Sequence, residues 1–151
     1  MPAQQTRDPY KIAERALATN AIVDIQAAVT ELIPVARTGE DKDTTGFLLI
    51  LTEKLLCSPP DVPTGIDATL VVLEKSAHNP LLMATGAQLI SEYIDRLPPE
   101  KALKVLYQAA RFALVTHHQK PDDASSSMFC LRVTLKTMHQ QIKGLKVTLN
   151  L

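Results

Sequence analysis

The clearest pattern of apolar and polar positions lies in the middle of the chain, in two segments that meet at Leu97-Pro98-Pro99. In the first segment, residues 80–97, apolar or small side chains recur every three or four positions, as on one buried face of a helix. Asn79 before Pro80 is a helix-start signal, because Asn accepts a backbone N–H and proline needs no donor in the first turn. The proline pair then prevents simple continuation of this helix.

The second segment, from Pro99 to about residue 118, is apolar around more than one face. Only Lys101, Lys104, Gln108 and Arg111 mark a narrow polar edge; the apolar residues include Ala102, Leu103, Leu106, Tyr107, Ala109, Ala110, Ala113, Leu114 and Val115. A helix that is apolar over so much of its girth is usually central in its domain. We therefore predict a helical hairpin whose second arm is the core of the protein.

Three further helices are predicted before the hairpin by the same periodicity. They run from residue 9 to about 36, over about 47–56 and over about 65–78. An acidic loop at 38–45 and a proline-rich connector at 58–63 separate them. Within the hairpin, Gly86 costs helix stability and is best explained by close approach of another helix, such as the long first one.

A sixth helix is predicted from about residue 123 to Gly144. Its apolar residues are separated alternately by three and four positions, which is a heptad seam; they are Met128, Leu131, Leu135, Met138, Ile142, Leu145 and Leu149. Two interpretations stay open: the seam packs inside the protein's own bundle, or it pairs with a second copy or another protein. If the helix ends at Gly144, residues 145–151 alternate and form a short extended apolar tail.

Together these elements predict an all-α protein, a compact bundle of about six antiparallel helices with a short extended C-terminal tail. Residues 1–8 are expected to be a flexible arm, 9–144 a single helical domain and 145–151 the tail. No segment before residue 144 alternates in the manner of a strand, so no sheet is predicted. The alternative architecture is a short superhelical stack of helix pairs.

Composition narrows the class of protein. The 151 residues are 46% hydrophobic and 21% charged, which suits one soluble domain. The longest purely apolar run, Phe47–Leu51, is too short to cross a bilayer, so no membrane contact is predicted. Cys57 and Cys130 form no metal or redox spacing, and lone thiols together with a polar N-terminus predict a cytoplasmic protein.

Charge is divided unevenly although the total is zero. Residues 1–96 carry eight basic and thirteen acidic side chains, whereas residues 97–151 carry eight basic and three acidic ones, so the balance moves from −5 to +5. A basic half favours an acidic partner or phosphates, and its candidate contacts are Arg132, Lys136, Lys143 and Lys146. An ordinary solvated helix face is the alternative interpretation.

Candidate chemistry is sparse. His117, His118 and Asp122 are the metal-ligand types that lie closest together, but adjacent His side chains on a helix point about 100° apart. Their position suits a helix C-terminus, where imidazolium offsets the dipole, so no metal site is predicted. No glycine-rich phosphate-binding motif is present, and neither a cofactor nor an enzyme activity is predicted.

The function favoured by these patterns is a small protein–protein interaction module, such as an adaptor or assembly accessory protein, that binds another protein or a second copy of itself. The predicted partner-binding residues lie on the last helix and tail: Met128, Leu131, Leu135, Met138, Ile142, Leu145, Val147 and Leu149. A nucleic-acid-associated protein that uses the basic half is one alternative. A small-ligand binder or enzyme, with a cavity beside Gly86, Tyr93 and Tyr107, is another.

Overall fold

The computed structural model describes residues 8–38, 42–57, 61–75, 80–119 and 125–148, and these residues form seven α-helices and no strand. The all-α class is therefore confirmed. In chain order the elements are α1 (Pro9–Thr19), α2 (Ile22–Thr38), α3 (Lys42–Cys57), α4 (Val62–Glu74), α5 (Pro80–Tyr93), the 3-10 helix η2 (Ile94–Arg96), α6 (Pro99–Gln119) and α7 (Ser125–Thr148).

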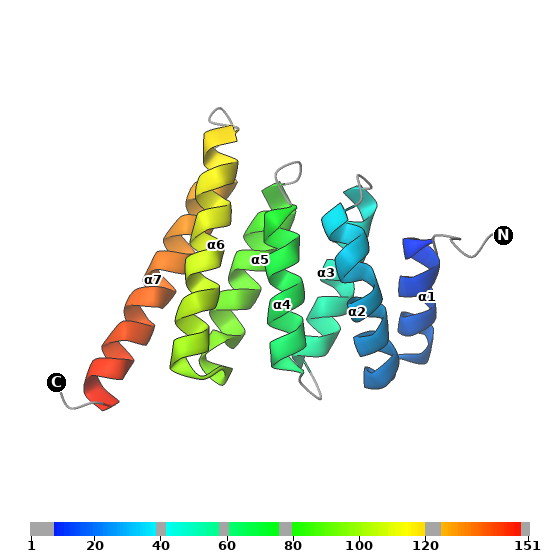
Figure 1. The fold of residues 1–151 in the computed structure, drawn as a ribbon, viewed down its shortest axis with the longest axis horizontal. Coiled ribbons are helices and arrows are strands. Elements are labelled where there is room, and N and C mark those ends of the chain that lie inside the picture. Colours follow the sequence, from blue (N-terminus) through cyan, green and yellow to red (C-terminus); the bar gives the residue numbers. More distant parts are fainter. Residues whose placement is uncertain (1–7, 39–41, 58–60, 76–79, 120–124, 149–151) are drawn as a thin grey trace.

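The helices follow one another in sequence order along the long axis of the molecule, with α1 at one end and α7 at the other (Figure 1). Each helix from α3 onward packs against the helix two places before it, so that α3 lies on α1, α4 on α2, α5 on α3, α6 on α4 and α7 on α5. Two rows result, one of odd-numbered and one of even-numbered helices. The compact packing agrees with the predicted bundle, and the order along one axis agrees with the alternative stack of helix pairs.

The single long helix predicted for residues 9–36 is wrong, because the chain breaks between α1 and α2. Asn20 has a φ of 53°, in the left-handed region, and its N–H donates to the Ala16 carbonyl. Asn tolerates this conformation better than most residues, so it ends the helix without a glycine. The break lets α1 fold back onto α2 and α3.

The two predicted connectors are also shorter than the sequence suggested. α3 begins at Lys42, inside the segment predicted to be an acidic loop, and Thr44 and Thr45 are buried in its first turns. α4 begins at Val62 because the Asp61 carboxylate accepts the Thr64 N–H as an N-cap. The same carboxylate accepts the Gln26 side-chain amide at 2.7 Å, which ties the start of α4 to α2.

The core is aliphatic and continuous along the stack. One group of buried side chains lies mainly among α1 to α4 and includes Leu82 of α5, and a second lies mainly among α4 to α7 and includes Leu56 of α3. The helices meet closely at two glycines: a Cβ at Gly65 would lie 2.6 Å from Leu56 Cδ2, and one at Gly86 would lie 3.0 Å from Leu73 Cδ2. The close neighbour of Gly86 is thus α4 and not the first helix.

Candidate functional site

The predicted central role of α6 is only half right. Its inner side is buried through Ala102, Val105, Leu106, Ala109, Ala113 and Thr116. Its other apolar residues are not covered, because Tyr107, Leu114 and Val115 are 60%, 52% and 51% exposed. The reason is position: α6 lies near the end of the stack, where α4 and α7 cover it on one side only.

The side of α7 that is buried is not the predicted seam. It is a line of small and hydroxyl-bearing residues, Ser127, Cys130, Thr134 and Thr137. Their hydroxyls have partners: Thr134 Oγ1 donates to the Cys130 carbonyl at 2.7 Å, and Thr137 Oγ1 lies 2.9 Å from Ser91 Oγ on α5. Small side chains with satisfied hydroxyls let α7 approach α5 and α6 closely.

The seam itself runs along the border between the buried and exposed sides of α7. Leu131 and Met138 are half-buried and pack against the core, and Met128 is also half-buried. Leu135 and Ile142, in contrast, are 51% and 41% exposed. The inner edge of the seam therefore packs within the protein's own stack, whereas its outer edge is open, and pairing of that edge with a partner stays a prediction.

The extended tail predicted from residue 145 is wrong as far as residue 148. The helix passes through Gly144 without a positive φ and ends at Thr148, so Leu145, Lys146 and Val147 are helical in backbone. The placement of their side chains, and the whole of Leu149, lie outside what the structure describes.

Some of the exposed apolar residues of α6 and α7 form one line across the two helices. The two helices are antiparallel neighbours, and the contact of Ser127 Oγ with His117 Nδ1 at 3.5 Å fixes their relative height. At about 1.5 Å per residue, Leu114, Leu135, Tyr107 and Ile142 then follow one another over about 18 Å, alternately from α6 and α7. We call the surface formed by these four residues the end face.

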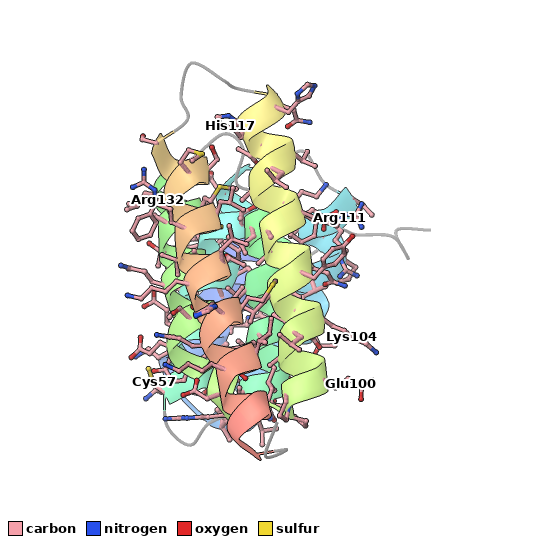
Figure 2. All side chains as sticks on the ribbon, turned by 90° about the vertical axis from the view of Figure 1, so that its left-hand side faces the viewer. Cys57, Glu100, Lys104, Arg111, His117 and Arg132 are labelled. Carbon is pink, nitrogen blue, oxygen red and sulfur yellow. The ribbon has the colours of Figure 1, made fainter. Side chains whose placement is uncertain are left out.

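The end face closes the stack at its C-terminal end. Figure 2 looks onto this end, with α6 and α7 side by side in front and with Arg111 and Arg132 pointing away to opposite sides. Tyr107 and Leu114 are four and three positions from Arg111, and Leu135 is three from Arg132, so they lie beside these arginines on the helix surface. Because both helices are right-handed, the i−4 and i+3 neighbours of each arginine lie on the side of it that faces the C-terminal end of the stack, so Tyr107, Leu114 and Leu135 face out from that end.

Basic side chains border the end face on both edges. Arg132 and Lys143 are exposed on α7, and Lys104 and Arg111 are exposed on α6, whereas Lys136 of α7 is exposed beside the hollow between α5 and α7. Residues 99–119 and 125–148 contain a single acidic residue, Glu100, whose carboxylate lies 3.8 Å from the Lys104 ammonium. An apolar strip with a basic border is the result.

The opposite end of the stack has a different character. α1 buries Ile12, Ala13 and Ala16 against its neighbours and exposes Lys11 and Glu14, with Tyr10 as its one large apolar residue that is exposed, at 54%. Stacked-helix proteins usually have polar outer faces on their terminal helices, because an apolar one would remain open to water. The C-terminal end departs further from this pattern, since α6 and α7 expose several large apolar residues.

The predicted metal-ligand types do not come together in the described part of the chain. His117 is half-buried beside Ser127, His118 is exposed, and Asp122 lies outside the described residues. No group of three or more His, Cys, Asp or Glu side chains is placed to hold a metal ion in that part.

The two thiols differ in environment. Cys57 is exposed, with its Sγ 3.9 Å from the Tyr93 hydroxyl, and this contact together with burial raises the pKa of Tyr93. Cys130 is buried, and burial raises the pKa of its thiol to about 11. A protonated, enclosed thiol of this kind is a poor nucleophile.

Two hollows lie on the sides of the stack. One of about 390 Å³ is formed between α2, α4 and α6 and contains Arg37, Asp67 and Phe112. Another of about 680 Å³ lies between α5 and α7. The space beside Gly86 is occupied by the side chain of Leu73, and Tyr107 lies on the end face. These two residues therefore do not line a common cavity.

No described helix is both long enough and apolar enough to cross a membrane. Comparison with known proteins gives no match: no protein-family model fits the sequence, and no curated protein or solved structure is significantly similar to it.

Proposed function

We propose that the protein is a small helical interaction module that binds another protein, or a second copy of itself, through the end face. The observation that carries this proposal is the line formed by Tyr107, Leu114, Leu135 and Ile142, large apolar residues that are 41% to 60% exposed. Scattered exposed apolar residues are common, but a contiguous patch on a soluble protein marks an interaction site.

Two further features support the proposal. Aromatic and large aliphatic side chains at the centre with a charged border are the usual composition of a protein interface. The mostly polar surface of α1, on which Tyr10 is the one large apolar residue that is exposed, indicates that an extended apolar end is not required for a stack of this kind to fold.

The test compares two double variants at exposed apolar positions. Leu135→Glu plus Ile142→Glu places two charges on the end face, whereas Ile50→Glu plus Val23→Glu places two on α3 and α2, where the side chains are 49% and 69% exposed. Leu131 is not suitable for this purpose because it packs against the core. Proteins captured from an extract of the source cells are quantified by mass spectrometry, and the oligomeric state is measured by light scattering.

The end-face variant is expected to lose the captured partners, or to become a monomer if the wild type is a dimer, while the control variant keeps them. Circular dichroism confirms that both variants fold. If the two variants retain the same partners and the same oligomeric state, the end face is not the binding surface and the proposal fails.

Binding to nucleic acid is a second candidate function, favoured by one observation. On α7, Lys136 and Lys143 follow Arg132 by four and eleven positions, so the three side chains share one side of the helix. Such a stripe can follow a phosphate backbone, with an affinity that falls steeply as salt is added. A gel shift with mixed-sequence DNA and RNA that is absent at 50 mM salt would remove this candidate.

A further inference from the structure

We infer that the partner segment that occupies the end face is an amphipathic helix with an apolar stripe and acidic residues along both edges. This inference rests on the proposed function, which requires only that the end face bind a protein. It adds the secondary structure of the partner segment and the sign of its charge.

The helical shape follows from the order of the stack. Each helix from α3 to α7 packs against the helix two places before it, so the next position in the array lies against α6 and beside α7. No described helix fills that position (Figure 1). A helix docked there extends the stack by one member and covers Tyr107, Leu114, Leu135 and Ile142 together.

The spacing of the exposed residues sets the length of the helix. The line extends over about 18 Å, which corresponds to about 12 helical residues or slightly more than three turns. A partner helix with apolar side chains at positions i, i+4, i+7 and i+11 presents one stripe of this length, as in other complexes where a helix lies in a groove.

The sign of the charge follows from the two edges. Arg132 of α7 and Arg111 of α6 lie on opposite sides of the line (Figure 2). Lys143 is exposed on the same side of α7 as Arg132, eleven positions further along, so a docked helix has a basic neighbour on each side. Acidic residues on both edges of the partner helix complement this border and speed association.

The same border argues against a second copy as the occupant. Two end faces brought together would place basic edges of one molecule against basic edges of the other, and such like-charge contacts are unfavourable. Residues 99–119 and 125–148 supply one carboxylate, Glu100, and the Lys104 ammonium already lies beside it.

The test uses two fluorescein-labelled peptides of 18 residues that share one leucine stripe at the spacing given above. One carries Glu at the positions that border the stripe, and the other carries Lys there. Fluorescence anisotropy is measured with the full-length protein. The Glu peptide is expected to bind in the micromolar range and the Lys peptide at least about tenfold more weakly, a difference of about 1.4 kcal/mol.

Three variants make the test specific. Leu135→Glu plus Ile142→Glu should abolish binding of the Glu peptide, while Ile50→Glu plus Val23→Glu should leave it unchanged. Arg132→Glu plus Lys143→Glu should reverse the preference toward the Lys peptide, because the α7 edge of the end face is then acidic and repels the Glu peptide.

The inference is overturned by any of three results. They are equal affinity for the two peptides, no binding of the Glu peptide, and a wild-type dimer that the Leu135→Glu plus Ile142→Glu variant converts to a folded monomer. In each case the proposed function survives if the Leu135→Glu plus Ile142→Glu variant fails to capture the cellular partners of the wild type or fails to form its dimer. The proposed function fails only if neither partners nor oligomeric state depend on the end face.

Discussion

At the scale of single residues, the two tightly packed glycines fix how closely α4 can approach its neighbours. A Cβ at Gly65 would lie 2.6 Å from Leu56 Cδ2 and 2.8 Å from its Cγ, and Leu56 is fully buried. At Gly86 the nearest atom is 3.0 Å away, whereas at Gly46 nothing lies within 4 Å. The three sites therefore form a graded series in which the backbone change is the same and the available space differs.

We expect Gly65→Ala to destabilise the protein by about 1–2 kcal/mol, because overpacking outweighs the gain of about 1 kcal/mol from helix propensity. Gly46→Ala should instead stabilise it by up to about 1 kcal/mol, with Gly86→Ala in between. Thermal unfolding followed by circular dichroism measures the series. An equal shift for all three variants would mean that the contacts at Gly65 and Gly86 relax at no cost.

The sequence predicted close approach at Gly86 but gave no such indication at Gly65. Gly86 interrupts a strongly periodic helical segment, so a packing reason was needed to explain it. Gly65 stands near the start of a helix after several prolines, where glycine is unremarkable. Which helix a glycine meets depends on long-range packing, and for this reason the neighbour predicted for Gly86 was wrong.

At the scale of helices, the break between α1 and α2 shows how one backbone conformation divides a segment that was predicted to be a single helix. Asn20 adopts a φ of 53°, and Thr19 Oγ1 accepts the Ala21 N–H at 3.4 Å beside it. In one continuous helix the group of residues buried in α1 would lie on nearly the opposite side from the group buried in α2. This change of phase and the Thr-Asn pair were the available signals, and the second is weak because Asn also occurs inside helices.

Asn20→Ala is expected to cost about 1 kcal/mol, because a Cβ-bearing residue without a polar side chain is strained in the left-handed region. Asn20→Gly should be neutral or slightly stabilising. The free energy of unfolding of the two variants, measured in urea, distinguishes an effect of the backbone conformation at residue 20 from an effect of the Asn20 side chain. If Gly destabilises as much as Ala, the side chain and not the backbone conformation is what matters.

Heptad spacing predicted the extent of the last helix up to Gly144 but left open which way its seam faces. Leu131 and Met138 of the seam pack against the core, yet the side of α7 that is fully buried carries Thr134 and Thr137. Hydroxyl groups that bond to the backbone of their own helix, as Thr137 Oγ1 does to the Val133 carbonyl at 2.8 Å, are compatible with burial. Apolar spacing cannot reveal this, because it treats every threonine as polar.

At the scale of the whole molecule, the stack is built from contacts between near neighbours in sequence. α1 and α7 each have packed helices on one side only, since they stand at the two ends (Figure 1). Stability in such arrays is approximately a sum of local terms. The sequence predicted the helical class from its periodicity, but the order of helices along one axis is a property of their mutual packing, so it remained an alternative.

Hydrogen exchange tests this view of the whole molecule. Amide protection is expected to be greatest in α4 and α5, in the middle of the stack, and to fall toward α1 at one end and α7 at the other, because terminal elements open with the lowest free energy. Addition of the Glu-bordered peptide should raise protection in α6 and α7 without changing α1, since binding stabilises only the units to which it is coupled. Uniform protection across all seven helices would instead indicate one cooperative bundle, and peptide-induced protection would then spread to α1 as well. The exchange pattern therefore separates an additive stack, in which a partner helix strengthens one end, from a single unit that any bound partner stabilises throughout.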